Sequence, residues 1–350
     1  MKTNFESRYK DKLNSLAENK KISEDQLLHF LSRGLQVLMP NLDFGLDSLN
    51  EYLPFIVIGA SRNYISRMKV PYQGTSFIAA NSRQDRKGAY IYKIPGKEGG
   101  GVTLLTNRKR KLGDSIFAST HRILMGHKAI MISATNLMIN KNKIWNWEFF
   151  GNHVRKFIPT VYYDLVKLAE KKGISRSPYC YVIIARSHET FRKLNIVEEY
   201  QRNRIAVLNP SNNVKVIFVT NQPGYDYMVK NIPESDLINY LVTGDQFDTY
   251  QAMLNLRKIH NIDMMLNDGG RQMSNGIRDA GLLAEERVTL EPYPGEGMLP
   301  SKIDPTSVLG MDGKGLDGTE LHGAILVNST KISDELANVY IYPLDEKKIF

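Results

Sequence analysis

The sequence predicts an α/β fold in which a mostly parallel central sheet is flanked by helices. From about Gly74 onward, short apolar runs alternate with segments of helical periodicity, and strands joined by crossover helices form parallel sheets. In residues 261–295 a buried strand, a glycine turn, a helix and a second strand follow one another. The 350 residues are 42% hydrophobic, which is enough for a substantial core in one large domain or two.

Residues 1–70 are predicted to form a helical N-terminal extension to a main domain of residues 71–350. Ser23 to Gln26 reads as a capping box, and the apolar residues from Leu27 to Val37 follow it at roughly helical spacing. We expect this extension to pack on the main domain or to contribute to a dimer contact.

Within the main domain, strands are predicted where short apolar or β-branched runs end at turn residues, and helices where apolar residues recur every three or four positions. The expected strands are 75–80, 88–94, 129–132, 179–185, 204–208, 214–220, 262–266, 287–290, 323–327 and 338–342. The expected helices are 114–125, 154–172, 250–260 and 271–280, the last with Gly281 as its C-cap, and residues 95–101 are expected to form a flexible loop.

The paired glycines of segment 261–295 carry the strongest functional signal. The strand Ile262 to Leu266 ends just before them, and a helix begins at Arg271. Glycines between a strand and a helix let backbone N–H groups approach an anion closely, with the positive end of the helix behind them. We predict that Gly269 and Gly270, with the N–H groups of Arg271 and Gln272, hold a cofactor pyrophosphate. A plain strand-to-helix turn is the alternative.

Composition disfavours several other classes of protein. No apolar run reaches about 18 residues, so we expect no membrane span. The first residues lack the apolar stretch of a secretory signal, so a cytoplasmic protein is expected. Cys180 is the single cysteine, which precludes an intrachain disulfide and a multi-cysteine zinc site, and we predict no metal. Neither G-x-S-x-G nor H-E-x-x-H occurs, which disfavours a hydrolase.

The net charge of +9 is compatible with three kinds of surface. The densest cluster, Arg108 to Lys111, is short and fits a solvated basic loop. A second reading is that the charge attracts a phosphorylated cofactor and an anionic substrate. Nucleic-acid binding ranks third, because no helix-turn-helix, zinc-finger or RNA-recognition signature accompanies the charge.

Residues 254–295 resemble the reductase domain of riboflavin biosynthesis, the C-terminal half of the bifunctional deaminase-reductase, which has a dihydrofolate-reductase-like fold. That family carries a strand, Glu-Gly-Gly, a helix, Gly-Leu-Val-Asp-Glu, a strand, then Pro and Gly. Here Asp268 replaces the glutamate before the matching glycines. The stretch from Gly281 to Glu285 follows at the family spacing, with Ala284 in place of the aspartate, and Pro292 and Gly295 close the motif.

The resemblance extends more weakly over residues 74–344 and implies where the substrate lies. The family's A-M-S-L-D-G motif borders the place where substrate and nicotinamide meet. Ala80 to Ser82 corresponds to its start, so Ser82 matches the family serine, and Asp85 replaces the aspartate through a shifted loop. The resemblance thus makes Ser82 and Asp85 the candidate catalytic residues. A charged surface turn is the alternative for this segment.

Two further segments resemble the parts of the family that bind the cofactor. His121 to Leu124 aligns with H-R-L-R, and Ser133, Thr135 and Asn136 then occupy the turn that faces the cofactor phosphates. Hydroxyl and amide groups can donate hydrogen bonds to phosphate oxygens. A helix N-cap with no ligand is the alternative for this turn.

Arg186 and Ser187 follow the strand 179–185, where dihydrofolate reductases often place a Ser-Arg pair against the 2′-phosphate of NADPH. The planar guanidinium suits a phosphate monoester. An arginine in a solvated loop is the alternative.

The resemblance implies an NADPH-dependent reductase, commonly a homodimer, that acts on a small anionic substrate of the polar heterocyclic or ribosyl-phosphate type. Two other functions stay open. A non-catalytic binding or scaffold protein of the same fold would explain the departures at Ser133, Asn136 and Ala284. A nucleic-acid-binding protein would explain the charge.

Overall fold

The structure of the protein is a computed structural model. It describes residues 77–85, 92–93, 119, 122–123, 128–157, 159–171, 173–262, 264–291, 299–300, 325–332 and 335–341. The predicted helical extension of residues 1–70 and the predicted loop 95–101 lie outside the described residues.

A nine-stranded sheet forms the centre of the described fold, with the strand order β10-β11-β8-β1-β7-β3-β4-β5-β6. The seven strands from β8 to β6 run parallel, while β11 pairs antiparallel with β8 and β10 antiparallel with β11. The predicted mostly parallel sheet is therefore confirmed. The strands are β1 Phe77–Asp85, β3 Ala129–Ser133, β4 Cys180–Ile184, β5 Lys215–Thr220, β6 Ile238–Val242, β7 Met264–Asp268, β8 Leu283–Glu291, β10 Ile325–Ile332 and β11 Glu335–Ile341, and a small second sheet pairs β2 Tyr92–Lys93 with β9 Leu299–Pro300.

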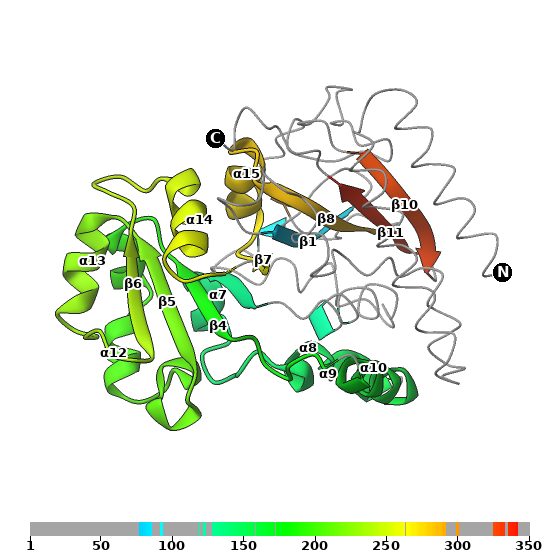
Figure 1. The fold of residues 1–350 in the computed structure, drawn as a ribbon, viewed down its shortest axis with the longest axis horizontal. Helices are drawn as coiled ribbons and strands as arrows, with labels where there is room; N and C mark the ends of the chain where they lie inside the picture. The colour runs from blue at the N-terminus through cyan, green and yellow to red at the C-terminus, as the bar shows by residue number, and fades with distance from the viewer. Residues whose placement is uncertain are drawn as a thin grey trace.

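Helices cover both faces of the sheet, with α12 and α13 on one side of β5 and β6 and α14 on the other (Figure 1). Four of the described α-helices begin at a side chain that accepts a backbone hydrogen bond: Ser133 for α7, Asn146 for α8, Asn221 for α13 and Asp248 for α14. The helices are α7 Ala134–Ile139, α8 Trp147–Phe150, α9 Asn152–Phe157, α10 Pro159–Lys171, α11 His188–Lys193, α12 Ile196–Gln201, α13 Gln222–Val229, α14 Thr249–Lys258 and α15 Arg271–Asp279, with 3₁₀ turns η3 Ala206–Leu208 and η4 Pro210–Asn212.

Apolar side chains pack on both faces of the strands. On one face, β-strand residues such as Val182 and Val219 contact α14 and α15 through Met253 and Ile277. On the other face, the ring of Phe218 packs edge-on against Phe191 of α11 and stacks on Tyr240 of β6. Every side chain of β4 is buried. Strands covered on both faces need apolar residues at every position, so β3, β4 and β5 read as continuous apolar runs in the sequence.

Helices α7, α8, α11, α12 and α13 were not predicted from the sequence, and several strand bounds differ by a few residues. Three further differences have a clear physical reason. Residues 204–208, predicted as a strand, contain the 3₁₀ turn η3, because the apolar side chains of Ile205, Val207 and Leu208 are buried by a helical turn that leads into Pro210. The predicted helix 154–172 is divided between α9 and α10, and Pro159 begins the second helix at a position where its missing N–H does no harm. Strand β6 was not predicted, because only Ile238 and Leu241 are buried and the pattern alternates poorly.

The chain order of the strands positions the candidate site. Strand β7 follows β6 in the sequence, yet it lies between β1 and β3. The predicted strand at 262–266 is thus a central strand, as expected. Because all the parallel strands point the same way, β1, β7, β3 and β4 end at the same edge of the sheet. Ligands of open α/β sheets bind at this carboxyl edge, where the strand order reverses.

Candidate functional site

The turn between β7 and α15 is fastened by side chains on both sides of Gly269. The backbone N–H of Gly269 donates to Asn267 Oδ1 at 2.9 Å, and Asn267 Nδ2 donates to Ser274 Oγ at 2.9 Å in the second turn of the helix. A Cβ at Gly269 would lie 3.0 Å from Asn267 Oδ1 and 3.2 Å from Met273 Cβ. This position therefore has little room for any residue other than glycine.

Gly270 is the N-cap of α15, with φ 87° and ψ 176°, a conformation that L side chains rarely adopt. No heavy atom of the described residues lies within 4 Å of the place that a Cβ would take. The carbonyl of Gly270 accepts from the N–H groups of Met273 and Ser274. The N–H groups of Arg271 and Gln272, in the first turn, have no acceptor within the helix. The turn therefore presents backbone donors beside open space.

The start of α7 lies against this turn. Asn136 Nδ2 donates to the carbonyl oxygen of Asp268 at 2.9 Å. Ser133 Oγ accepts from the Asn136 N–H at 3.1 Å, so the N-cap interpretation of Ser133 is confirmed. Thr135 is half-buried in the first turn of α7. Ser133 still carries a hydroxyl proton, so its predicted role as a phosphate donor remains open to experiment.

Arg186 and Ser187 follow β4 at the same edge of the sheet. Cζ of Arg186 lies 5.8 Å from the centre of the Phe247 ring. A methyl group on Gly276 of α15 would come 3.3 Å from Arg186 Nη2, so the exposed guanidinium lies beside the helix that begins at the glycine turn. Ser187 instead begins α11, with its Oγ 3.5 Å from Thr190 Oγ1. The structure therefore brings Arg186, more directly than Ser187, to the predicted site.

Ser82 and Asp85 lie in the last part of β1, opposite Val288 and Glu291 of β8. The pairing of β1 with β7 ends earlier, at Ala80 and Asn267. Both residues therefore extend beyond the paired part of β7, at the edge that carries the glycine turn. The alternative of a surface turn is wrong for this segment, because β1 continues in a regular register to Asp85.

An ion pair at the turn was not predicted from the sequence. Arg122 Nη2 donates to both carboxylate oxygens of Asp268, at 2.9 Å and 2.8 Å. The same guanidinium lies over the ring of Phe150, 5.7 Å from its centre. Both residues occur in the motifs that resemble the reductase family, but no pattern in the sequence indicates that they meet.

Helix α15 is tied to β8 by buried charges. Arg278 Nη2 of α15 lies 2.5 Å from Glu286 Oε2 of β8, and both side chains are fully or almost fully buried. Glu285 pairs with Arg287 at 2.7 Å, also fully buried. Adjacent strand residues point to opposite faces, so the two pairs lie on the two sides of β8. The helix that carries the glycine turn is thus held by a specific polar contact as well as by packing.

Three other features of the described residues bear on function: the cysteine, clusters of possible metal ligands, and helices that could span a membrane. Burial raises the pKa of the Cys180 thiol to about 12, although Lys215 and Lys128 lower it. Among the described residues, no three His, Cys, Asp or Glu side chains come together as metal ligands would. Each helix in the described ranges is too short or too polar to span a bilayer.

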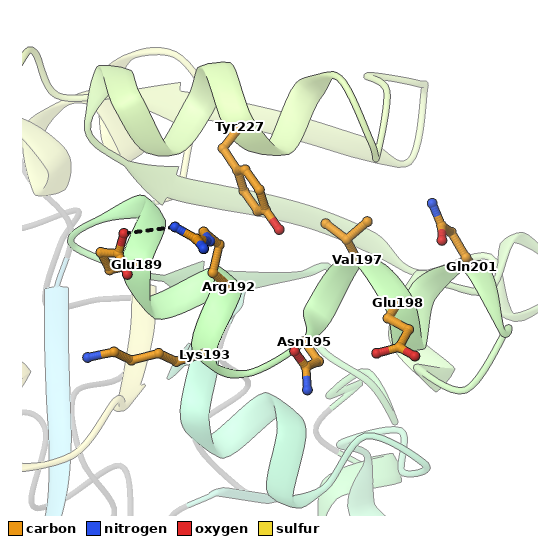
Figure 2. A pocket seen from close by; sticks show the side chains of 8 residues that line it. All are labelled: Glu189, Arg192, Lys193, Asn195, Val197, Glu198, Gln201 and Tyr227. Carbon is orange, nitrogen blue, oxygen red and sulfur yellow. Dashed lines mark hydrogen bonds and ion pairs between the residues drawn. The ribbon is translucent and has the colours of Figure 1, made fainter.

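A surface hollow of about 470 Å³ lies between α13 and the pair α11 and α12 (Figure 2). Tyr227 of α13 faces Arg192 of α11 across the hollow. Arg192 forms an ion pair with Glu189, which lies on the same helix and also lines the hollow. Its lining combines both signs of charge and shares no residue with the glycine turn. We therefore place the candidate site at the turn, where backbone donors converge, and not in this hollow.

No protein-family model matches the sequence, and no curated protein sequence matches it. Solved structures similar to this one include the riboflavin biosynthesis reductase of Saccharomyces cerevisiae, with 12% identity over 76% of this chain and 90% of that chain and a TM-score of 0.38. A pyrimidine reductase-like protein from Corynebacterium diphtheriae has 11% identity over 79% and 96%, with a TM-score of 0.48. Dihydrofolate reductase from Enterococcus faecalis, complexed with NADP(H), has 11% identity over 77% and 97%, with a TM-score of 0.28.

These TM-scores are all below 0.5 and the identities are 11–12%, so the similarity does not show the family or the activity of this chain. What the chain does must be argued from the geometry of its own residues.

Proposed function

We propose that the protein is an NADPH-dependent reductase that acts on a small anionic substrate, a polar heterocycle or a ribosyl phosphate. The observation that carries the proposal is the glycine turn at the strand-order reversal. Gly270 has a positive φ, and among the described residues the space before it is open. The first-turn N–H groups of α15, which have no acceptor within the helix, lie next to it. A phosphate group needs this combination of unpaired donors and close backbone approach.

The residues around the turn suit the parts of a dinucleotide. Gly269 and Gly270 with the N–H groups of Arg271 and Gln272 would hold the pyrophosphate. Ser133, Thr135 and Asn136 at the start of α7 would add side-chain donors, since Asn136 already contacts the turn. When bound, the nicotinamide supplies the hydride, and the protein orients it and stabilises charge.

The discrimination between NADPH and NADH is assigned to Arg186, with Ser187 assisting. Arg186 is exposed and lies beside α15, one helix turn or more beyond the glycines. Its charge at that distance suits the 2′-phosphate rather than the pyrophosphate. Ser82 and Asp85, at the end of the neighbouring strand β1, would meet the substrate.

Gly270→Val tests the proposal, measured by fluorescence titration with NADPH. The added side chain would fill the open space before the turn, so we expect binding to be lost while the fold is retained. Gly173→Val is the matched control, because Gly173 also has a positive φ, 64°, with open space around it but lies between α10 and β4. Both variants place a side chain at a positive φ, which costs on the order of 1–3 kcal/mol, and the cost is larger at Gly270, whose φ of 87° and ψ of 176° essentially only glycine adopts. Unchanged NADPH affinity in Gly270→Val would refute the assignment of the turn.

A second candidate, a non-catalytic scaffold, is favoured by the hydrogen bonds at α7. The side chains of Ser133 and Asn136 both form hydrogen bonds within the protein. Ser133 caps α7, and Asn136 donates to the carbonyl oxygen of Asp268. A wild-type protein that binds neither NADPH nor NADH in the same titration would support this scaffold function over the reductase.

A further inference from the structure

The carboxylate of Asp268 stands one residue before the paired glycines. Its side chain is 12% exposed, so solvent screens its charge only in part. A negative charge in this place opposes the binding of phosphate to the neighbouring turn. A dinucleotide site at the turn therefore requires that the charge of Asp268 be balanced.

Arg122 provides the balancing charge. One guanidinium nitrogen, Nη2, donates to both oxygens of Asp268 at 2.9 Å and 2.8 Å. The Arg122 side chain is 26% exposed and is backed by the ring of Phe150.

The backbone of Asp268 is held independently of this ion pair. Asn136 Nδ2 donates to its carbonyl oxygen, and the next N–H, of Gly269, is bound to Asn267. The shape of the turn therefore has its own supports. The ion pair makes a modest contribution to stability. Its main effect is on the charge next to the glycine turn.

We propose that Arg122 is a charge-balancing residue of the phosphate site, which neutralises Asp268 and so permits the glycine turn to accept an anionic ligand. Arg122 itself does not touch the ligand. This inference rests on the proposed function, and it assigns a role to a residue far from the glycines in sequence.

The test is a double-mutant cycle at Arg122 and Asp268 in the full-length protein. The quantities measured are the affinities for NADPH and for inorganic pyrophosphate, each at low and high salt. Arg122→Ala leaves the Asp268 charge unbalanced, so we expect about tenfold weaker binding of both, equivalent to about 1.4 kcal/mol. The loss should shrink at high salt, because salt screens the repulsion. Adding Asp268→Asn to Arg122→Ala removes the repulsion and should restore affinity to within about threefold of wild type.

Asp268→Asn alone should bind as tightly as wild type or more tightly, because Arg122 is then an unbalanced cation. Arg202→Ala is the control, since Arg202 forms an exposed pair with Glu198 away from the turn, and its affinity should not change. Thermal unfolding of each variant separates loss of binding from loss of fold. If Arg122→Ala does not fold, Asp268→Asn decides.

Two outcomes would overturn the inference: a double variant as weak as Arg122→Ala, or an Asp268→Asn protein that binds pyrophosphate more weakly than wild type. Either would show that the pair acts through structure and not through charge. Pyrophosphate binding without NADPH binding in the wild type would instead overturn the proposed reductase alone, and the same cycle, read with pyrophosphate, would still decide the role of Arg122.

Discussion

At the scale of single residues, the site depends on a few cations that lie at the carboxyl edge of the sheet. Arg122 is paired with Asp268, and Arg186 is an exposed residue that lies beside α15 and over the ring of Phe247. The two arginines therefore serve different purposes in the proposed reductase. The first neutralises the turn, and the second is placed to meet a ligand charge in solvent.

Replacing Arg186 with alanine should weaken NADPH binding and leave NADH nearly unaffected. A charge-assisted pair with the 2′-phosphate contributes about 1.5–3 kcal/mol, or roughly ten- to a hundredfold in affinity. Parallel fluorescence titrations with the two cofactors give the ratio. Arg192→Ala, at an exposed arginine of α11, is the control. Equal losses for both cofactors would mean that Arg186 supports the structure only.

At the scale of elements, α15 links the site to the rest of the sheet. Its first turn follows the glycines, its middle lies beside Arg186 at Gly276, and its end is bound to β8 through Arg278 and Glu286. The C-cap is Ala280 and not the predicted Gly281, which comes next at φ 73° and lets the Leu282 N–H donate to the Ile277 carbonyl. A shift of this helix would therefore move the turn.

Replacing Arg278 with methionine should lower the free energy of unfolding by about 3–5 kcal/mol, because it removes one partner of a buried ion pair and deprives the carboxylate of Glu286 of the charge of Arg278. Urea unfolding followed by far-UV circular dichroism measures the change. The double variant Arg278→Met with Glu286→Leu should recover most of the loss, since two apolar side chains can replace a buried ion pair. A double variant less stable than the single one would contradict this account.

At the scale of the whole molecule, the order of strands brings distant residues together. Arg122 and Asp268 are 146 positions apart, so no local pattern could have predicted their contact. The sequence did predict the central strand β7, helix α15 and the glycine at which that helix ends, because apolar periodicity and glycine chemistry act locally. It missed β6 and mistook η3 for a strand, because burial there depends on neighbours that only the fold supplies.

Cys180 lies at the start of β4, inside the sheet, so the accessibility of its thiol reports on the unfolding of the whole molecule. Burial raises its pKa from 9.0 to about 12. Between these values the unfolded chain binds fewer protons than the folded one, so the stability from this group is present below pH 9.0 and is lost as pH rises toward about 12. A thiol reagent at pH 8 should label Cys180 only after unfolding, and the alkaline loss of stability should be smaller in Cys180→Ala. Rapid labelling of the native protein would contradict the burial of this residue.

The position of β7 has a consequence for how the chain acquires its structure. Strands β1 and β3 form no ladder with each other in the described fold, because β7, which follows both of them by more than 100 residues, is inserted between them. Until residues 264–268 have been synthesised, each of these strands presents an open edge that can pair with another molecule. Contacts so distant in sequence also form late and slowly. A nascent or truncated chain that ends before β7 is therefore expected to be prone to aggregation, and the strand that leads into the proposed cofactor site is also the strand that joins β1 to β3.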